Sequence, residues 1–196
     1  MQVKTEFKSF NNNSFTAKYK NPINIGKLKN KYESYTASFV EIEPQNKDDV
    51  SALENAIKYW VNDKFGINAL YAVRAARDGS QYYCYHKVYA LTAQRDNFEK
   101  LNPDEILGVV HVGLVGDNKL FVEHLQTNPN YLYKTKPEYV GIGTAMINSL
   151  KGLCNMMTLF SSKEKSVKDF YIKNGFCENP PHSNAYTWIK DIFDRF

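Results

Sequence analysis

The sequence predicts a mixed α/β fold, in which a mostly antiparallel central sheet is flanked by helices. Three observations predict it: β-branched and aromatic runs of strand length, apolar residues at helical spacing between some of these runs, and short turns between others. The predicted order is strand, helix, three strands, helix, strand, helix, strand. This order is typical neither of a doubly wound parallel sheet nor of a β-sandwich.

The first strand and helix are predicted near residue 40. Residues 35–42 (YTASFVEI) are β-branched and aromatic, and Pro44 closes that strand. From Asp48 to Lys64 apolar residues recur at steps of three and four, with Gly66 just past the end. We therefore expect one amphipathic helix that covers the sheet.

Three strands are predicted next. Residues 81–94, 106–115 and 120–127 are strand-like and are separated by turn-forming residues. Residues 116–119 (GDNK) suit a short turn, so the second and third of these strands are expected to form an antiparallel hairpin.

The C-terminal part is predicted to hold a strand, a helix and a last strand. Residues 157–160 are a brief apolar strand, and residues 161–164 (SSKE) fit a capping box that opens a helix. That helix is expected to stop at Asn174-Gly175. Residues 185–189 (AYTWI) are the last predicted strand.

Length and composition indicate one domain. The chain has 196 residues, 43% of them apolar, which is enough for one core. We expect the domain over residues 35–196, preceded over residues 1–34 by an arm that is either disordered or docked. No apolar run approaches the roughly 20 residues of a membrane span, and no secretory signal is evident. The expectation is a cytoplasmic protein without a membrane partner.

Neither the net charge nor the cysteine content indicates a particular class of function. The net charge of +4 is spread along the chain, which favours plain solubility over an anionic partner. The three cysteines lie far apart, outside any disulfide framework or zinc pattern. We interpret them as reduced and structural.

The sharpest motif is the glycine pair in Val140-Gly141-Ile142-Gly143-Thr144, which precedes a helix predicted to extend to about residue 153. Glycines allow a tight turn and a close approach to a ligand, and the first N–H groups of a helix favour a pyrophosphate. A tight structural turn explains the pair equally well. The segment is not a P-loop, because no Lys-Ser/Thr pair follows the second glycine at the required spacing. It fits a dinucleotide-binding fingerprint poorly, because the third glycine is missing.

Three segments resemble the GNAT acetyltransferases. Residues 138–143 (EYVGIG) are similar to the family's acyl-coenzyme A loop, Gln/Arg-x-x-Gly-x-Gly/Ala, except at Glu138. Residues 122–129 (VEHLQTNP) resemble its fourth strand, with Thr127 where Val is frequent. Residues 169–176 (DFYIKNGF) resemble its Phe-Tyr-x-x-x-Gly-Phe helix end. Because the three follow in the family's order, the chain is identified as a member of this superfamily.

The resemblance implies the GNAT fold and direct transfer of an acetyl (acyl) group from acetyl-coenzyme A (acetyl-CoA), a co-substrate, to a primary amine. In this family two parallel strands splay apart, and the exposed backbone of the fourth strand pairs with the pantetheine arm of the cofactor. The residues so implied are Leu125, Gln126 and Thr127 for that arm, and Val140, Gly141, Ile142, Gly143, Thr144 and Ala145 for the pyrophosphate.

The resemblance also implies two catalytic residues. Tyr171 resembles the tyrosine that protonates the departing thiolate; core packing is the alternative. Glu123 resembles an acid near the acyl carbon, so it is the candidate base for the amine; a solvated or salt-bridged carboxylate is the alternative. Glu41 and Glu43 are weaker candidates. Three histidines lie in predicted strands: His86, His111 and His124. They lack metal-ligand spacing, and we interpret them as hydrogen-bonded structural residues.

The acceptor is left open between an amine-bearing small molecule and a peptide or protein. Residues 64–80 and 180–184 are the expected acceptor loops. Arg74, Arg77 and the tyrosines of residues 82–85 suit an acidic or aromatic acceptor, and equally suit a surface.

Two other functions compete with the transferase. The first is a non-catalytic GNAT-like module that binds coenzyme A or a protein partner, because Glu138, Thr127 and Glu164 depart from the family pattern. The second is nucleic-acid binding through dispersed lysines and strand tyrosines, which the charge pattern disfavours. The oligomeric state is left open, a dimer included.

Overall fold

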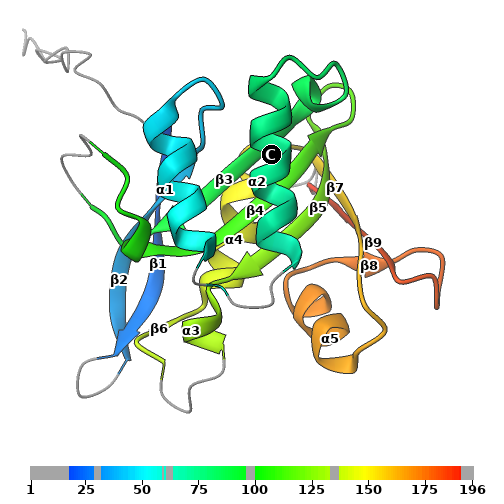
Figure 1. Cartoon of the computed structure of the whole chain (residues 1–196). Helices are drawn as coiled ribbons and strands as arrows, with labels where there is room; N and C mark the ends of the chain where they lie inside the picture. Colours follow the sequence, from blue (N-terminus) through cyan, green and yellow to red (C-terminus); the bar gives the residue numbers. More distant parts are fainter. Residues whose placement is uncertain are drawn as a thin grey trace, which may run out of the picture.

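A computed structural model describes residues 18–28, 32–58, 60, 64–95, 100–132 and 137–190. Within these ranges the chain forms a sheet with helices on both faces (Figure 1). The strands are β1 (Lys18–Leu28), β2 (Tyr32–Glu41), β3 (His86–Thr92), β4 (Ile106–Leu114), β5 (Lys119–Thr127), β6 (Tyr139–Val140), β7 (Met156–Phe160), β8 (Cys177–Glu178) and β9 (Ala185–Ile189). The helices are α1 (Lys47–Lys58), α2 (Lys64–Arg77), α3 (Pro129–Leu132), α4 (Ile142–Lys151) and α5 (Lys165–Lys173), with 3₁₀ turns η1 (Tyr83–Tyr85) and η2 (Pro103–Glu105).

The sheet is mixed and mostly antiparallel, as predicted. Its described strands follow the order β6-β1-β2-β3-β4-β5-β7-β9-β8. Neighbours are antiparallel except β5 and β7, which run parallel. The predicted hairpin joins β4 to β5, with Gly116 and Asn118 at positive φ. A sheet buries its apolar side chains against helices that pack on its faces, so a hydrophobic core forms between each face and the helices on it.

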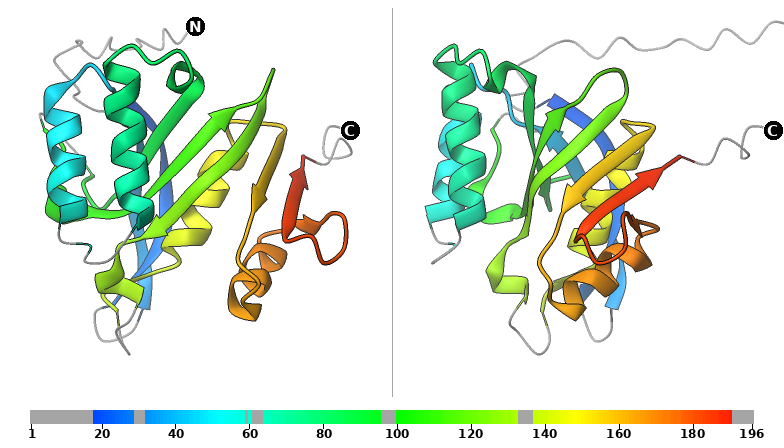
Figure 2. Two further views of the ribbon diagram at one scale, coloured as in Figure 1. Left: turned by 45° about the vertical axis from the view of Figure 1, so that its right-hand side comes forward. Right: turned by 90° about the vertical axis from the view of Figure 1, so that its right-hand side faces the viewer.

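Helices α1 and α2 cover one face of the sheet, and α4 covers the other (Figure 2). On the first face Leu53 and Val73 pack with Val88 of β3. On the second face Met146 of α4 packs with Val110 of β4, in a core that α5 also borders. None of the described helices has the length and apolar character needed to cross a membrane.

The single helix predicted from Asp48 to Lys64 is wrong in extent. Helix α1 ends at Lys58, and a second helix, α2, begins at Lys64 and contains Gly66. The glycine lets α2 lie close to α1, because a side chain there would begin 3.0 Å from the Ile57 side chain. The expected acceptor loop over residues 64–80 is therefore mainly helix. Its buried face consists of small residues, which weakened the apolar signal.

The expected arm over residues 1–34 contributes a strand to the sheet. Residues 18–28 form β1, which pairs with β2 and, at Gly26 and Lys27, with β6. Residues 18–28 of the expected arm are therefore part of the sheet, and residues 32–34 belong to β2. Residues 1–17 and 29–31 lie outside the described residues.

The capping box predicted over residues 161–164 is wrong. Helix α5 begins at Lys165, and its N-cap, Glu164, makes no side-chain capping bond. Ser161 instead continues the extended path of β7, because its N–H donates to the carbonyl of Asn184 at 2.9 Å. The predicted helix end at Asn174-Gly175 is confirmed, with Gly175 at a φ of 77°.

Candidate functional site

Strand β5 loses one of its two neighbours halfway along its length. It pairs with β7 from Lys119 to Val122, and the two strands then separate (Figure 2). Its pairing with β4 continues to Thr127. Among the described strands, none lies beside the outer edge of β5 from Glu123 onward. This edge therefore offers backbone N–H and C=O groups to a ligand.

The start of α4 offers a second set of backbone donors. Its N-cap, Gly141, has a φ of 80° and no capping side chain. The N–H of Ala145 donates to the Gly141 carbonyl at 2.9 Å, which closes the first helical turn. The N–H groups of Ile142, Gly143 and Thr144 come before this bond, so they have no acceptor within the helix. The helix dipole adds partial positive charge at the same place. An anionic group is stabilised at such a position.

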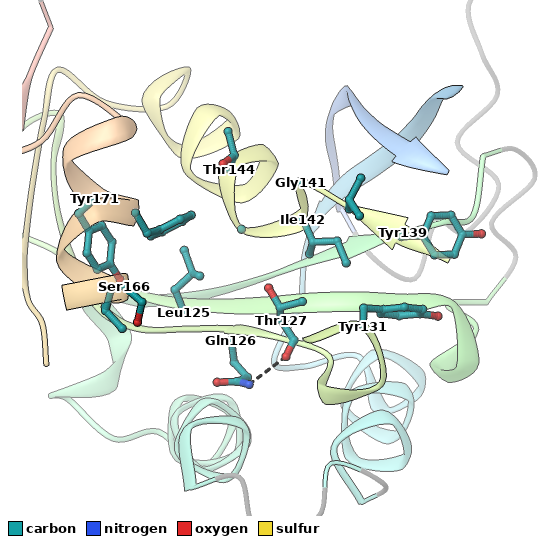
Figure 3. A pocket seen from close by; sticks show the side chains of 14 residues that line it. Leu125, Gln126, Thr127, Tyr131, Tyr139, Gly141, Ile142, Thr144, Ser166 and Tyr171 are labelled. Carbon is teal, nitrogen blue, oxygen red and sulfur yellow. Dashed lines mark hydrogen bonds between the residues drawn. The ribbon is translucent and has the colours of Figure 1, made fainter. Parts of the chain in front are cut away.

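A cavity of about 510 Å³ lies between the start of α4, the edge of β5 and α5 (Figure 3). This volume is typical of a small-molecule or cofactor site. Eight of the nine residues predicted to hold a cofactor line it, and so does Tyr171. The eight are Leu125, Gln126, Thr127, Val140, Gly141, Ile142, Gly143 and Thr144.

Two predicted site residues do not line the cavity. The side chain of Ala145 is 3% exposed, and its N–H is already bonded within the helix. It therefore supports the helix start and has no group facing the cavity. Glu123 lies outside the cavity as well, two residues before Leu125, the first residue of β5 that lines it.

The two loop glycines serve different physical needs. Gly141 adopts the left-handed conformation, and a Cβ there would meet no atom within 4 Å. Gly143 has no such φ, but its Cβ would lie 3.1 Å from Cζ of Phe170 on α5. Gly141 is thus required by backbone conformation and Gly143 by packing of α5 against α4.

Tyr171 lines the cavity from α5 (Figure 3). Its ring packs against Phe170, Phe176 and Tyr186, with centroids 5.0, 5.6 and 5.6 Å away. Burial raises the pKa of the Tyr171 hydroxyl to about 12. The phenol therefore keeps its proton at neutral pH and remains a hydrogen-bond donor.

Glu123 belongs to a bulge on the α2 face of the sheet. His124 pairs with His111 and Val122 with Val112, so Glu123 is the extra residue of β5. Its carboxylate lies above Gly113 of β4, with Oε1 3.8 Å from the point where a Cβ would begin. Glycine at 113 thus leaves room around the carboxylate.

Three histidines follow one another across β3, β4 and β5 beside this bulge. Nδ1 of His86 lies 2.8 Å from Nε2 of His111, and the His111 and His124 ring centroids are 5.8 Å apart. Nε2 of His124 lies 3.2 Å from Nδ2 of Asn68 on α2. Burial and the two flanking histidines lower the pKa of His111 to about 3. Burial also lowers the pKa of His86, although Glu123 opposes this shift.

The weaker acid candidates on β2 and just after it lie apart from the cavity. Glu41 is 3% exposed and forms ion pairs with Lys20 and Lys87. Burial alone would raise the pKa of Glu41, but hydrogen bonds from both lysines outweigh it and lower that pKa. An acid held by two ammonium groups is a poor proton acceptor. Neither it nor Glu43 lines the cavity.

The arginines considered for an acceptor already have partners. Arg74 pairs with Glu54 at 2.7 Å, and Arg77 pairs with Asp78 at 3.0 Å. Tyr83 instead packs near the bulge, with its ring centroid 5.0 Å from that of His86. Of the expected acceptor residues, Tyr83 is the one tied to Glu123, whose charge contributes to a raised pKa of the Tyr83 phenol after the larger effect of burial. Residues 180–184 connect β8 to β9.

Glu138, which departs from the family pattern, does not line the cavity. Its carboxylate lies 3.5 Å from Nζ of Lys27 on β1. An acidic residue beside an anion site is unfavourable, but a paired carboxylate opposes a bound anion less.

Sequence reasoning missed several residues of the cavity wall. Tyr131 comes from α3, a four-residue helix without periodicity, and it meets Tyr139 edge to face at 5.5 Å. Phe170 was visible within a motif, but its contact with Gly143 depends on tertiary packing. The lining residues not predicted are Tyr131, Tyr139, Ser166, Val167 and Phe170.

The fold is that of the GNAT acetyltransferases. A protein from Desulfovibrio desulfuricans described as an acetyltransferase of the GNAT family superposes with a TM-score of 0.51 at 11% identity, over 78% of this chain and 98% of that chain. A GNAT-family acetyltransferase from Staphylococcus aureus superposes with a TM-score of 0.48 at 14% identity, over 79% of this chain and 99% of that chain. PaiA N-acetyltransferase from Thermoplasma acidophilum, in complex with coenzyme A, superposes with a TM-score of 0.44 at 13% identity, over 79% of this chain and 98% of that chain. By sequence, the chain matches no protein-family model and no curated protein.

Proposed function

We propose that the protein transfers an acetyl group from acetyl-CoA directly to a primary amine. The observation that carries the proposal is the cavity itself. Within it, the unpaired edge of β5, the uncapped start of α4 and the Tyr171 phenol face one volume. A cofactor with an amide-bearing arm, a pyrophosphate and a thioester has one group for each of these three features.

The β5 edge and the α4 start support the binding of the donor. The arm of coenzyme A contains amides, which can pair with the free backbone of Leu125 to Thr127 as an added strand does. Its pyrophosphate fits the N–H groups of Ile142 to Thr144. The Thr127 hydroxyl lies near that loop, since its Oγ1 is 3.9 Å from the Cβ position of Gly143.

The transfer needs a neutral amine. A protonated amine first gives one proton to a base, and its lone pair then forms the C–N bond to the acetyl carbonyl carbon. The C–S bond breaks with its electron pair on sulfur. The second proton leaves nitrogen, and sulfur ends as the thiol, so the reaction releases one proton overall.

Tyr171 is proposed to stabilise the departing sulfur. Full proton transfer from a phenol of pKa about 12 to a thiolate of ordinary pKa about 8.5 is uphill by roughly 5 kcal/mol. Donating a hydrogen bond to the developing thiolate does not carry that cost, and in a dry site it is worth about 3 kcal/mol. Reprotonation of sulfur can then follow from solvent.

Glu123 is proposed to receive the first proton. It stands at the β5 bulge, on the face of the sheet opposite α4 and next to the splayed edge. An amine that approaches from the α2 face would meet the carboxylate there. A lysine-type amine needs this help most, because losing a proton at pH 7 costs it about 4.6 kcal/mol.

The proposed function is tested by thiol release. Purified protein is mixed with acetyl-CoA and a panel of small primary amines, short peptides with free N-termini, and peptides with internal lysines. We expect at least one acceptor to release coenzyme A thiol and to gain 42 mass units, the mass of an added acetyl group in place of hydrogen. Binding of acetyl-CoA without thiol release by any acceptor would favour the non-catalytic coenzyme A module.

A further inference from the structure

Glu123 and His86 share one open space on the α2 face of the sheet. The point where a Gly113 side chain would begin is 3.8 Å from Oε1 of Glu123 and 3.6 Å from Cε1 of His86. His86 in turn contacts His111, nitrogen to nitrogen, at 2.8 Å. A carboxylate and two imidazoles are thus placed in sequence, from the β5 bulge into the sheet.

His111 is costly as a purely structural residue. It is 4% exposed, and in the described part of the chain its Nδ1 has no hydrogen-bond partner. A buried nitrogen without a partner is destabilising, because it has lost its bond to water, and such groups often mark a functional site. Val109 and Val110 of the same strand show that aliphatic residues are accommodated nearby.

We propose that His86 takes up the proton that Glu123 draws from the acceptor amine, and that His111 holds His86 in the tautomer that can do so. The proposal rests on the proposed function and extends it. His86 is the catalytic residue here. His111 acts through it and is a positioning residue.

The proton path can be written atom by atom. The ammonium group of the acceptor gives one proton to the Glu123 carboxylate, and one water molecule in the space beside Gly113 relays a proton from that carboxylate to Nε2 of His86. His86 becomes an imidazolium, Glu123 regains its charge, and the proton then leaves His86 for water. For Nε2 to accept, neutral His86 must carry its hydrogen on Nδ1 and donate it to Nε2 of His111.

The surroundings of His111 suit it for accepting that hydrogen bond. Burial and the neighbouring histidines keep its pKa near 3, so it is neutral at any working pH. A neutral imidazole can accept at Nε2, whereas an imidazolium cannot. Among the described residues, the other titratable groups facing His86 are Glu123 of β5, Tyr83 of η1 and its N-cap Tyr82, the two tyrosine ring centroids lying 5.0 and 4.8 Å away.

The test is the pH dependence of kcat/KM with the fastest acceptor of the panel. In the wild type, activity should fall as pH drops through the pKa of His86, which burial holds below its usual value. His86→Gln should lose about 10² in kcat and shift this acid limb to lower pH. His111→Gln should lower kcat with little change in KM, and imidazole nitrogen NMR should show His86 leaving the Nδ1–H tautomer.

Two further variants separate catalysis from folding. Gly113→Ala adds a methyl at ordinary contact distances of 3.6 to 3.9 Å, so it should fold normally yet slow turnover by filling the shared space. His124→Gln removes an imidazole of the same cluster outside the proposed path, and it should leave the acid limb in place.

The outcomes are distinguishable. A wild type that binds acetyl-CoA but acetylates no amine would reject the proposed function, and this inference with it. Measurable wild-type turnover with an unmoved acid limb in His86→Gln would reject the inference alone, as would full activity in Gly113→Ala. The shifted limb, together with slow Gly113→Ala, would support it.

Discussion

Tyr171 combines two roles in one side chain, and a single atom separates them. Its ring packs against the core on the α4 face of the sheet, and the same residue lines the cavity. The sequence indicated the residue through the Asp169–Phe176 motif. It could not indicate the raised pKa, because that shift comes from burial by distant neighbours such as Tyr186.

Tyr171→Phe keeps the ring and removes the donor. We expect kcat to fall by about 10² to 10³, because the hydrogen bond forms mainly in the transition state, while acetyl-CoA affinity stays nearly constant. Steady-state thiol release and calorimetry measure the two quantities. The loss should shrink with an acyl donor whose thiol has a lower pKa. Full turnover in the variant, with chemistry rate-limiting, would leave Tyr171 as a packing residue.

The high pKa of Tyr171 also gives a pH prediction. A group that keeps its proton until pH about 12 cannot cause an alkaline loss of activity between pH 7 and 10. Wild type and Tyr171→Phe should therefore show the same shape of kcat against pH in that range. A limb present only in the wild type would mean that the phenol ionises there.

Glu123→Gln should affect acceptors unequally. Deprotonation at pH 7 costs a lysine-type amine about 3 kcal/mol more than an α-amine. The variant should thus lose more kcat/KM with a lysine peptide than with glycinamide, both measured by thiol release. Asp117→Asn, which removes a carboxylate from the exposed β4–β5 turn, is the matched control. Equal losses with both acceptors would assign Glu123 to orientation of the amine.

The elements of the sheet centre were predictable and those of its margin were not. β4 and β5 follow apolar, β-branched runs, and burial explains their pattern. β1 escaped prediction because its sequence, KYKNPINIGKL, is polar and mostly half-exposed, and β2 supplies its pairing. α2 escaped because its buried face uses Ala69, Ala72 and Val73, whose small side chains carry little apolar signal.

The contact between α4 and α5 is an element-scale constraint that can be measured. Gly143→Ala would place a methyl 3.1 Å from Phe170, so we expect a loss of about 1 to 3 kcal/mol in unfolding free energy. Urea unfolding measures it. The double variant with Phe170→Leu should recover part of the loss. An unchanged free energy in Gly143→Ala would show that α5 is free to move away.

Most of the proposed donor site was predictable because backbone groups, rather than side chains, form it. A glycine loop before a helix and a strand with a motif fix where N–H and C=O groups lie, whatever the neighbours are. The proposed acceptor side depends on residues from η1, α2 and three strands, such as Asn68, Tyr83 and His86. Their contacts follow from the fold of the whole molecule, so the sequence offered no local signal for them.

Binding of acetyl-CoA in the cavity between β5 and α4 is tested by calorimetric titration of acetyl-CoA into the wild type and Gly141→Val. We expect one site in the wild type and affinity more than tenfold weaker in the variant, because a β-branched residue resists a φ of 80° and displaces the N–H groups. Both proteins should remain folded by circular dichroism. Absence of binding in the wild type, or equal affinity in two folded proteins, would contradict it.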